Sequence, residues 1–218
     1  MVYVLADNII SPLGDTSEDN YQAVKAGKSA IRAYAPMTDG IPDGFIASLM
    51  SADFEDLVFR SVGKAIEASG INVADARSVF ILSSTKGAIE GLGKDADENL
   101  YLGETAQRIA TRLGFTTRPV VVCNACISGS AAMILASRLL QLGTYDHVVV
   151  CGADCPQRFI VSGFQSLNAM SAEPCRPFDI ERQGLNLGEA AATVVLSSRL
   201  PVGEPATNKS DKRFWMIG

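Results

Sequence analysis

Two cysteines three positions apart are the residues of this chain best suited to chemistry. Cys123 and Cys126 lie in the stretch Val120-Val-Val-Cys-Asn-Ala-Cys-Ile-Ser-Gly-Ser, where a β-branched run changes into a helical pattern. A thiolate at the first turn of a helix faces unpaired backbone N–H groups and the positive end of the helix dipole, and both stabilise the anion. Because Cys126 lies at the turn whereas Cys123 is expected to end the strand, Cys126 is the better candidate nucleophile.

A tight turn from a strand into a helix does two further things for such a sulfur atom. It exposes the side chain, and it directs the backbone N–H of the same residue toward an oxyanion. Gly129 and the small residues after it allow a substrate or another backbone to come close. These features make Cys126 a candidate nucleophile and its own backbone N–H a candidate oxyanion donor.

Other interpretations of the cysteines stay open from the residues alone. A cysteine is often a small buried hydrophobic residue, which is the expectation for Cys123, Cys151 and Cys175. The Cys123-x-x-Cys126 pair also has the spacing of a redox dithiol. It could be half of a zinc site, but the second pair would then have to be Cys151 and Cys155. With ligands this sparse, we expect no metal site and no cofactor.

The remaining acid–base candidates have structural interpretations. The chain has one histidine, His147, so any histidine-based scheme rests on it. Its place beside a strand start favours a partly buried structural role. Glu173 and Glu189 resemble catalytic carboxylates, but solvation or hydrogen bonds to loop backbone are the roles that we expect for them.

Composition narrows the class of protein. Of 218 residues, 47% are hydrophobic and 20% are charged, which suits a sizeable core. The formal net charge of -5, from 19 basic and 24 acidic residues, argues against broad nucleic-acid binding. No apolar run is long enough to cross a bilayer, and the first residues lack the positive region of a signal peptide. The odd count of five cysteines suggests reduced thiols, so we expect a cytoplasmic location.

The elements around the cysteines are expected to alternate between strands and helices. Strands are predicted at residues 2–10, 79–82, 120–122, 147–150 and 193–196, with a further edge strand at 214–217. Helices are predicted at 16–27, 53–69, 105–113 and 128–142, and residues 33–44 are expected to form a loop. This alternation predicts an α/β domain with a five-stranded mixed, mostly parallel sheet and helices on both faces. The helix at 128–142 is apolar nearly all round, so it is expected to be the most buried.

Several motifs, taken in order, resemble one known family. They are Ile10-Ser-Pro-Leu-Gly, Asn124-Ala-Cys-Ile-Ser-Gly, Val148-Val-Val-Cys-Gly-Ala, Arg176-Pro-Phe-Asp and Gly188-Glu. Their order and spacing resemble the N-terminal half of a β-ketoacyl synthase, a condensing enzyme of the thiolase superfamily. The resemblance covers nearly the whole chain, so residues 1–218 are expected to form a β-ketoacyl synthase N-terminal-like domain with a thiolase-like half fold.

The resemblance implies the decarboxylative Claisen condensation of fatty-acid or polyketide synthesis. Cys126 would accept an acyl group from an acyl carrier protein or acyl-CoA thioester, and a carbanion from a malonyl thioester would attack the acyl-enzyme. The two catalytic histidines of the family lie in its C-terminal half, which is expected to come from a separate chain or from beyond this sequence. The implied partners are therefore the carrier, a second copy in a homodimer, or a complementary C-terminal half.

Departures from the family pattern define the competing hypotheses. Arg182-Gln-Gly-Leu stands where the family has Arg-Asp-Gly-Phe. Only Arg60 and Lys64 represent the basic cluster that docks an acidic carrier protein. The missing histidines suit a non-catalytic partner or regulatory subunit, similar to a chain-length factor, whereas retention of Cys126 argues for a catalytic component. A dithiol redox protein is the third hypothesis.

Overall fold

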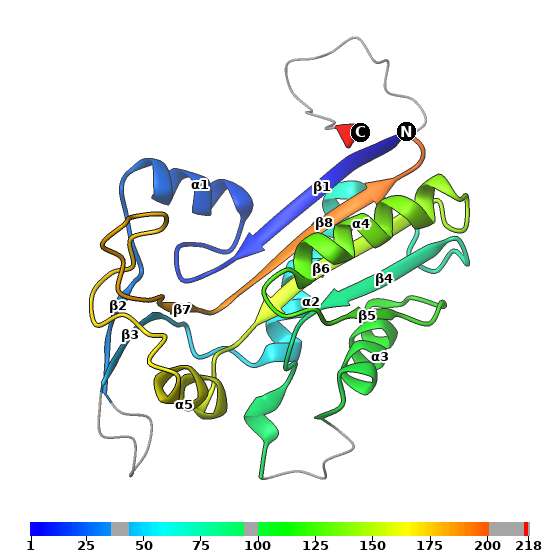
Figure 1. The fold of residues 1–218 in the computed structure, drawn as a ribbon. Coiled ribbons are helices and arrows are strands. Elements are labelled where there is room, and N and C mark those ends of the chain that lie inside the picture. Colours follow the sequence, from blue (N-terminus) through cyan, green and yellow to red (C-terminus); the bar gives the residue numbers. More distant parts are fainter. Residues whose placement is uncertain (36–43, 94–99, 201–215, 218) are drawn as a thin grey trace.

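A mixed β-sheet runs through the middle of the fold, which the computed structural model describes for residues 1–35, 44–93, 100–200 and 216–217 (Figure 1). The strand order is β5-β4-β6-β8-β1-β9. The strands of this sheet are β1 (Val2–Ile10), β4 (Ser78–Ser83), β5 (Val120–Val122), β6 (His147–Asp154), β8 (Ala190–Ser197) and β9 (Met216–Ile217).

Strand directions confirm the expected mixed sheet. β4 pairs in parallel with β5 and β6, whereas β8 runs antiparallel to both β6 and β1. β1, β4, β5 and β6 therefore share one direction, and β8 opposes them. The two-residue β9 extends these five strands at the edge formed by β1. Because β4, β5 and β6 are parallel, their carboxyl ends meet at one edge of the sheet, which is where ligands bind in many α/β folds.

Helices cover both faces of this sheet, as expected. α2 (Phe54–Ser69) and α3 (Leu102–Leu113) pack on one face around a core that includes Phe80 and Val149. α4 (Ser128–Gln141) packs on the other face against Ile81 and Val150 (Figure 1). Alternate residues of β4 and β6 thus serve two separate cores, which explains why these strands are apolar on both faces.

Short-range signals fix the helix ends close to the predicted positions. The Asp53 side chain accepts a hydrogen bond from the backbone N–H of Asp56 and caps α2, and Gly70 ends that helix at a left-handed φ of 67°. Thr16 caps α1 (Ser17–Lys25) in the same way through the N–H of Asp19. α3 begins three residues before the predicted start and ends at Gly114, as expected.

The expectation that the helix at 128–142 is the most buried is wrong. α4 buries four positions in the described structure, whereas α2 buries six. Ile134 and Leu142 of the predicted helix are 53% and 79% exposed. Only one side of α4 faces the sheet, so an apolar composition all round does not by itself bury a helix.

Several short elements escaped the sequence patterns. A second sheet has the order β2-β3-β7, from β2 (Arg32–Tyr34), β3 (Phe45–Ser48) and β7 (Leu187–Gly188). α5 (Arg158–Ser166) packs on it through Val161, and a 3-10 turn, η1, covers Ile89–Gly91. The predicted loop at 33–44 begins inside β2. Its residues 36–43, and residues 214–215 of the predicted edge strand, lie outside the described residues.

The described residues contain no helix that is both long enough and apolar enough to span a bilayer.

Candidate active site

Cys126 lies in the turn between β5 and α4, as the sequence predicted. The backbone N–H of Ile127 donates to the carbonyl of Asn124 at 3.2 Å, and the N–H of Ser128 donates to the carbonyl of Ala125 at 3.2 Å. Ala125 has a φ of 47°, a left-handed conformation that is uncommon for a residue with a side chain. Such strain persists only where the surroundings impose it, and it is frequent next to reactive residues.

The Ser128 side chain holds this turn closed. Its hydroxyl donates to the carbonyl of Ala125 and accepts from the backbone N–H of Asn124, both at 2.7 Å. Ser128 itself is buried. One side chain therefore fixes the backbone on both sides of Ala125 and, through it, the direction in which Cys126 leaves the turn.

The environment of Cys126 suits a nucleophile. Its thiol is free and exposed, and it comes two residues before the first residue of α4. The N-cap residue, Ile127, offers no side-chain hydrogen bond to the helix. The backbone N–H groups of the first helical turn therefore receive no side-chain cap from the N-cap residue. Uncapped N–H groups and the positive end of the helix dipole both favour a negative charge nearby. An exposed thiolate in this position can attack a carbonyl carbon.

Cys123 is exposed, so the expectation of a buried hydrophobic residue is wrong for this cysteine. β5 ends at Val122, one residue earlier than that expectation requires. The Cys123 thiol lies 3.9 Å from the carbonyl oxygen of Thr85, in the segment that follows β4. Both cysteines of the Cys-x-x-Cys motif are therefore reachable from solvent.

The other cysteines differ from this pair. Cys151 and Cys155 are both buried, and Cys175 is partly buried. Burial raises the pKa of Cys151 to about 12. Burial, together with the nearby carboxylates of Glu189 and Glu90, also raises the pKa of Cys155. These two thiols stay protonated at neutral pH, so neither can serve as the thiolate nucleophile.

A polar pair that the sequence patterns missed lies at the same edge of the sheet. The Ser84 hydroxyl donates to the Asp154 carboxylate at 3.1 Å and accepts from the N–H of Gly87 at 3.1 Å. Loss of hydration raises the pKa of Asp154, while the Ser84 hydrogen bond acts in the opposite direction. Ser84 directly follows β4 and Asp154 ends β6, and both strands are parallel. A polar residue at the carboxyl end of a parallel strand was the sequence signal that could have identified this pair. They order the segment whose Thr85 carbonyl contacts Cys123.

Glu189 organises a loop, one of the two roles expected for it. It is 3% exposed, and its carboxylate accepts hydrogen bonds from the backbone N–H groups of Met50, Ser51 and Ala52 at 2.8, 2.9 and 2.6 Å. Ser51 has a φ of 57°, so the carboxylate holds the loop in a strained conformation immediately before the α2 cap.

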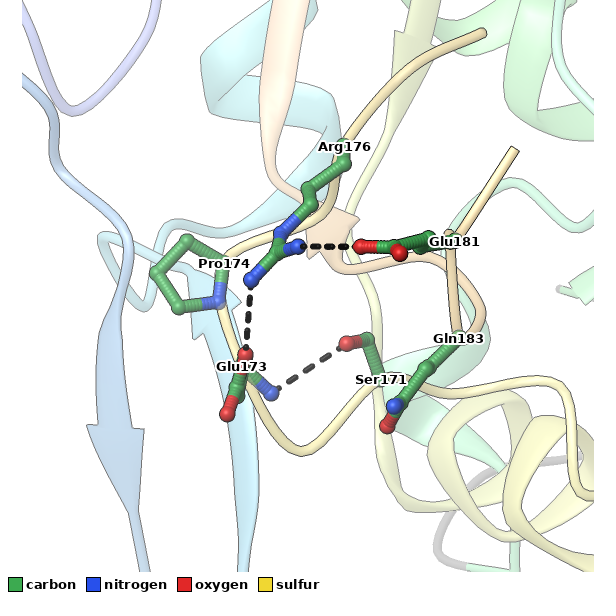
Figure 2. A pocket seen from close by; sticks show the side chains of 6 residues that line it. All are labelled: Ser171, Glu173, Pro174, Arg176, Glu181 and Gln183. Carbon is green, nitrogen blue, oxygen red and sulfur yellow. Dashed lines mark hydrogen bonds and ion pairs between the residues drawn. The ribbon is translucent and has the colours of Figure 1, made fainter. Parts of the chain in front are cut away.

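Glu173 belongs to an exposed loop instead. Figure 2 shows Arg176 between Glu173 and Glu181, at 3.4 and 3.8 Å. These residues, with Ser171, Pro174 and Gln183, line a cavity of about 20 Å³, which is room for roughly one water molecule. The cavity is too small for an acyl thioester.

His147 lies at the far end of the sheet from Cys126. It begins β6, whereas the cysteine turn follows the carboxyl end of the parallel strand β5. The eight residues of β6 span roughly 23 Å. His147 is partly buried, as expected, and burial lowers its pKa. It therefore does not face the Cys126 turn.

The expected basic contacts for a carrier protein are occupied within the chain. Arg60 forms an ion pair with Asp15 at 2.9 Å, and the Lys64 ammonium donates to the carbonyl of Asp15 at 2.9 Å. They lie beside an open groove of about 720 Å³ lined by Asp15, Asp53 and other aspartates. An acidic groove repels an acidic partner, so the two basic residues in which the sequence departs from the family's docking cluster lie beside charge of the opposite sign.

Comparison with known sequences supports an assignment for the domain. Residues 1–200 match the family model described as Beta-ketoacyl synthase, N-terminal domain. Nodulation protein E of Rhizobium leguminosarum bv. trifolii is 31% identical over 94 residues, 43% of this chain and 23% of that protein. The 3-oxoacyl-[acyl-carrier-protein] synthase 2 of Rhizobium meliloti (strain 1021) is 37% identical over 83 residues, 34% of this chain and 20% of that protein. The alignments thus span less than a quarter of either relative.

Solved structures agree on the fold. A ketosynthase in complex with its chain length factor, from Xenorhabdus doucetiae, superposes with a TM-score of 0.73 at 23% identity. The superposition covers 92% of this chain and 58% of that one. This likeness confirms the expected thiolase-like α/β architecture.

Proposed function

We propose a function from one premise: the chain belongs to the β-ketoacyl synthase family, whose N-terminal domain it matches over residues 1–200. Cys126 accepts an acyl group from a thioester of acyl carrier protein or coenzyme A. The observation that carries this proposal is the free, exposed thiol of Cys126 in a strained turn at the start of α4. The domain proposed for residues 1–218 is the acyl-accepting half of a condensing enzyme.

In the proposed reaction the Cys126 thiolate attacks the carbonyl carbon of the acyl thioester. A new C–S bond forms, and the oxygen of the tetrahedral intermediate accepts a hydrogen bond from the backbone N–H of Cys126. The carrier leaves as a thiolate with the electrons of the broken C–S bond. The product is a thioester on Cys126, ready for attack by a carbanion from a decarboxylating malonyl thioester.

The condensation step needs groups from elsewhere. His147 lies at the opposite end of β6, and burial lowers its pKa. We therefore propose that a complementary C-terminal half supplies the histidines and the second oxyanion donor. Exposed apolar side chains at α4 support such a partner: Ile134 lies within the helix, and Ile127 and Leu142 flank it.

A homodimer and a cytoplasmic location complete the proposal. β5 occupies an edge of the main sheet, and its three valines are only partly buried, which suits pairing with a second copy. All five cysteines are free thiols, which fits a reducing compartment. Light scattering after size-exclusion chromatography tests the dimer, and a monomer at micromolar concentration would contradict it.

The decisive test of the function is acylation of the isolated chain. We expect incubation with a radiolabelled or intact-mass-traceable acyl-CoA to add one acyl group, located on Cys126 by peptide mapping. Cys126→Ala should abolish the adduct, whereas Cys175→Ala should retain it, since Cys175 lies outside the turn. Absence of an adduct, or an adduct that survives Cys126→Ala, would refute the proposal. Absence would also favour a non-catalytic, chain-length-factor-like subunit.

A further inference from the structure

The proposed acyl transfer uses one of two accessible thiols and leaves the other without a role. Cys123 and Cys126 are both free and exposed, with two residues between them. Cys151 and Cys155 are buried thiols with raised pKa values, and Cys175 lies in a separate loop. Two exposed thiols only three positions apart therefore set this pair apart from the other cysteines.

The turn between the two cysteines is short and already closed by hydrogen bonds. The carbonyl groups of Asn124 and Ala125 each accept from an N–H three residues ahead, which curls the chain between β5 and α4. A ring closed across two intervening residues costs little chain entropy. The only hydrogen bond described for the Cys123 thiol is the long 3.9 Å contact to the Thr85 carbonyl, so its side chain can leave that contact at little cost.

The two sulfur atoms have unequal surroundings. Cys126 immediately precedes the cap of α4, at the positive end of the helix dipole. Cys123 precedes the turn and faces a carbonyl oxygen, which accepts a hydrogen bond from the neutral thiol. Cys126 is therefore the attacking thiol toward an oxidant, and Cys123 is placed to resolve the adduct.

We propose that Cys123 and Cys126 form a reversible disulfide with a small disulfide oxidant such as oxidised glutathione, and that this bond masks the nucleophile. Formation of the disulfide is independent of the proposed function, whereas its effect on acylation rests on that function. The site is a redox-sensitive modification site in which Cys123 protects Cys126 from lasting adducts and switches acyl transfer off.

The chemistry balances in two exchanges. The Cys126 thiolate attacks one sulfur of oxidised glutathione, forms a mixed disulfide and releases one glutathione thiolate, which takes up a proton. Cys123 then loses its proton to solvent, attacks the Cys126 sulfur, and releases the second glutathione. The protein dithiol is oxidised by two electrons, and one glutathione disulfide is reduced to two thiols.

Intact-mass measurement of the full chain during titration with oxidised glutathione tests the proposal. We expect the wild-type chain to lose two hydrogen atoms in mass, with Cys123 and Cys126 together protected from alkylation and restored by dithiothreitol. Cys123→Ser should instead retain one glutathione on Cys126, because the resolving thiol is gone. Cys175→Ser is the matched control and should behave like the wild type.

Two outcomes would overturn the proposal. One is wild-type protein that accumulates glutathione adducts without conversion to an internal disulfide. The other is an internal disulfide that peptide mapping assigns to a different pair. The intact mass and the peptide map are both measured on the wild-type chain, so these two tests do not depend on whether a variant folds. If the disulfide forms but the reduced chain fails to acylate, the proposed function is wrong and the redox site remains.

Discussion

Helices α2 and α4 lie on opposite faces of one sheet and differ most at their amino ends. α2 begins with a side-chain cap from Asp53, and the backbone N–H of Phe54 donates a second hydrogen bond to the Glu90 carboxylate at 3.1 Å. α4 begins at Ser128, its N-cap Ile127 makes no side-chain hydrogen bond, and Cys126 comes immediately before that cap. Both helices pack on a core, but side chains cap the amino end of α2, whereas the amino end of α4 has an exposed thiol beside it.

The lateral surfaces of the two helices also differ, because α2 is more buried than α4. α2 buries six residues against the sheet and α3, whereas α4 leaves Ile134 more than half exposed. A helix that is buried and capped contributes mainly to stability. A helix with an open end and an uncovered side is suited to chemistry and to a partner. The comparison therefore places the capped, more buried helix on one face of the sheet and the proposed acyl-accepting turn beside the helix on the other.

The largest effect should come from the open end of α4. We expect Cys126→Ser to slow acylation by at least about a thousandfold, because a hydroxyl in this turn has no base described beside it to remove its proton. Single-turnover acylation measured by mass spectrometry gives the rate. Circular dichroism should remain unchanged. An acylation rate close to that of the wild type would contradict the role of Cys126 as the acyl acceptor.

Truncations in the two helices should separate their roles in stability. Leu57 of α2 is fully buried, so Leu57→Ala should lower the free energy of unfolding by about 2–5 kcal/mol. Ile134→Ala on the outward side of α4 should change it by about 0.5 kcal/mol or less. Urea denaturation followed by circular dichroism measures both. Equal losses would mean that the outer side of α4 is buried between copies of the chain.

The loop that leads into α2 should be the next most sensitive feature. Glu189→Gln removes the charge that three backbone N–H groups share, so the free energy of unfolding should fall by about 1.5–3 kcal/mol. Glu173→Gln is the matched control and should have little effect, since its ion pair with Arg176 is exposed. The same urea experiment compares them, and an unchanged Glu189→Gln midpoint would contradict the structural role.

The smallest expected effect is a pH dependence at the sealed end of α2. Burial raises the pKa of Glu90 above its ordinary value of 4.5, so the folded state holds this proton more tightly than the unfolded chain does. The resulting stability is fully present below pH 4.5 and is lost as the pH rises through the folded-state pKa. Glu90→Gln lacks this titration.

Unfolding measured at several pH values between acid and neutral checks this prediction. The difference in stability between the wild-type chain and Glu90→Gln should shift toward the variant as the pH rises. A difference independent of pH would show that the Glu90 carboxyl is as well solvated in the folded state as in the unfolded chain.

Much of the fold was predictable because its signals are local. The Asp53 cap, Gly70 and Gly114 at helix ends, and the β-branched run at 120–122 each act within a few residues, and each gave a correct boundary. The strands β6 and β8 are longer than predicted because Gly152 and Ala192 pair across the sheet. Cross-strand pairing leaves no mark on the hydrophobicity of either segment, so it was not visible in the sequence.

The sequence by itself determined the turn at Cys126, since a β-branched strand, small residues and a helical pattern in that order allow few other arrangements. Only the tertiary structure decided which thiols are accessible, which side of α4 meets the sheet, and that Ser84 and Asp154 lie together at its edge. These facts depend on contacts between residues far apart in the chain. Burial and charge are properties of those contacts rather than of residue type.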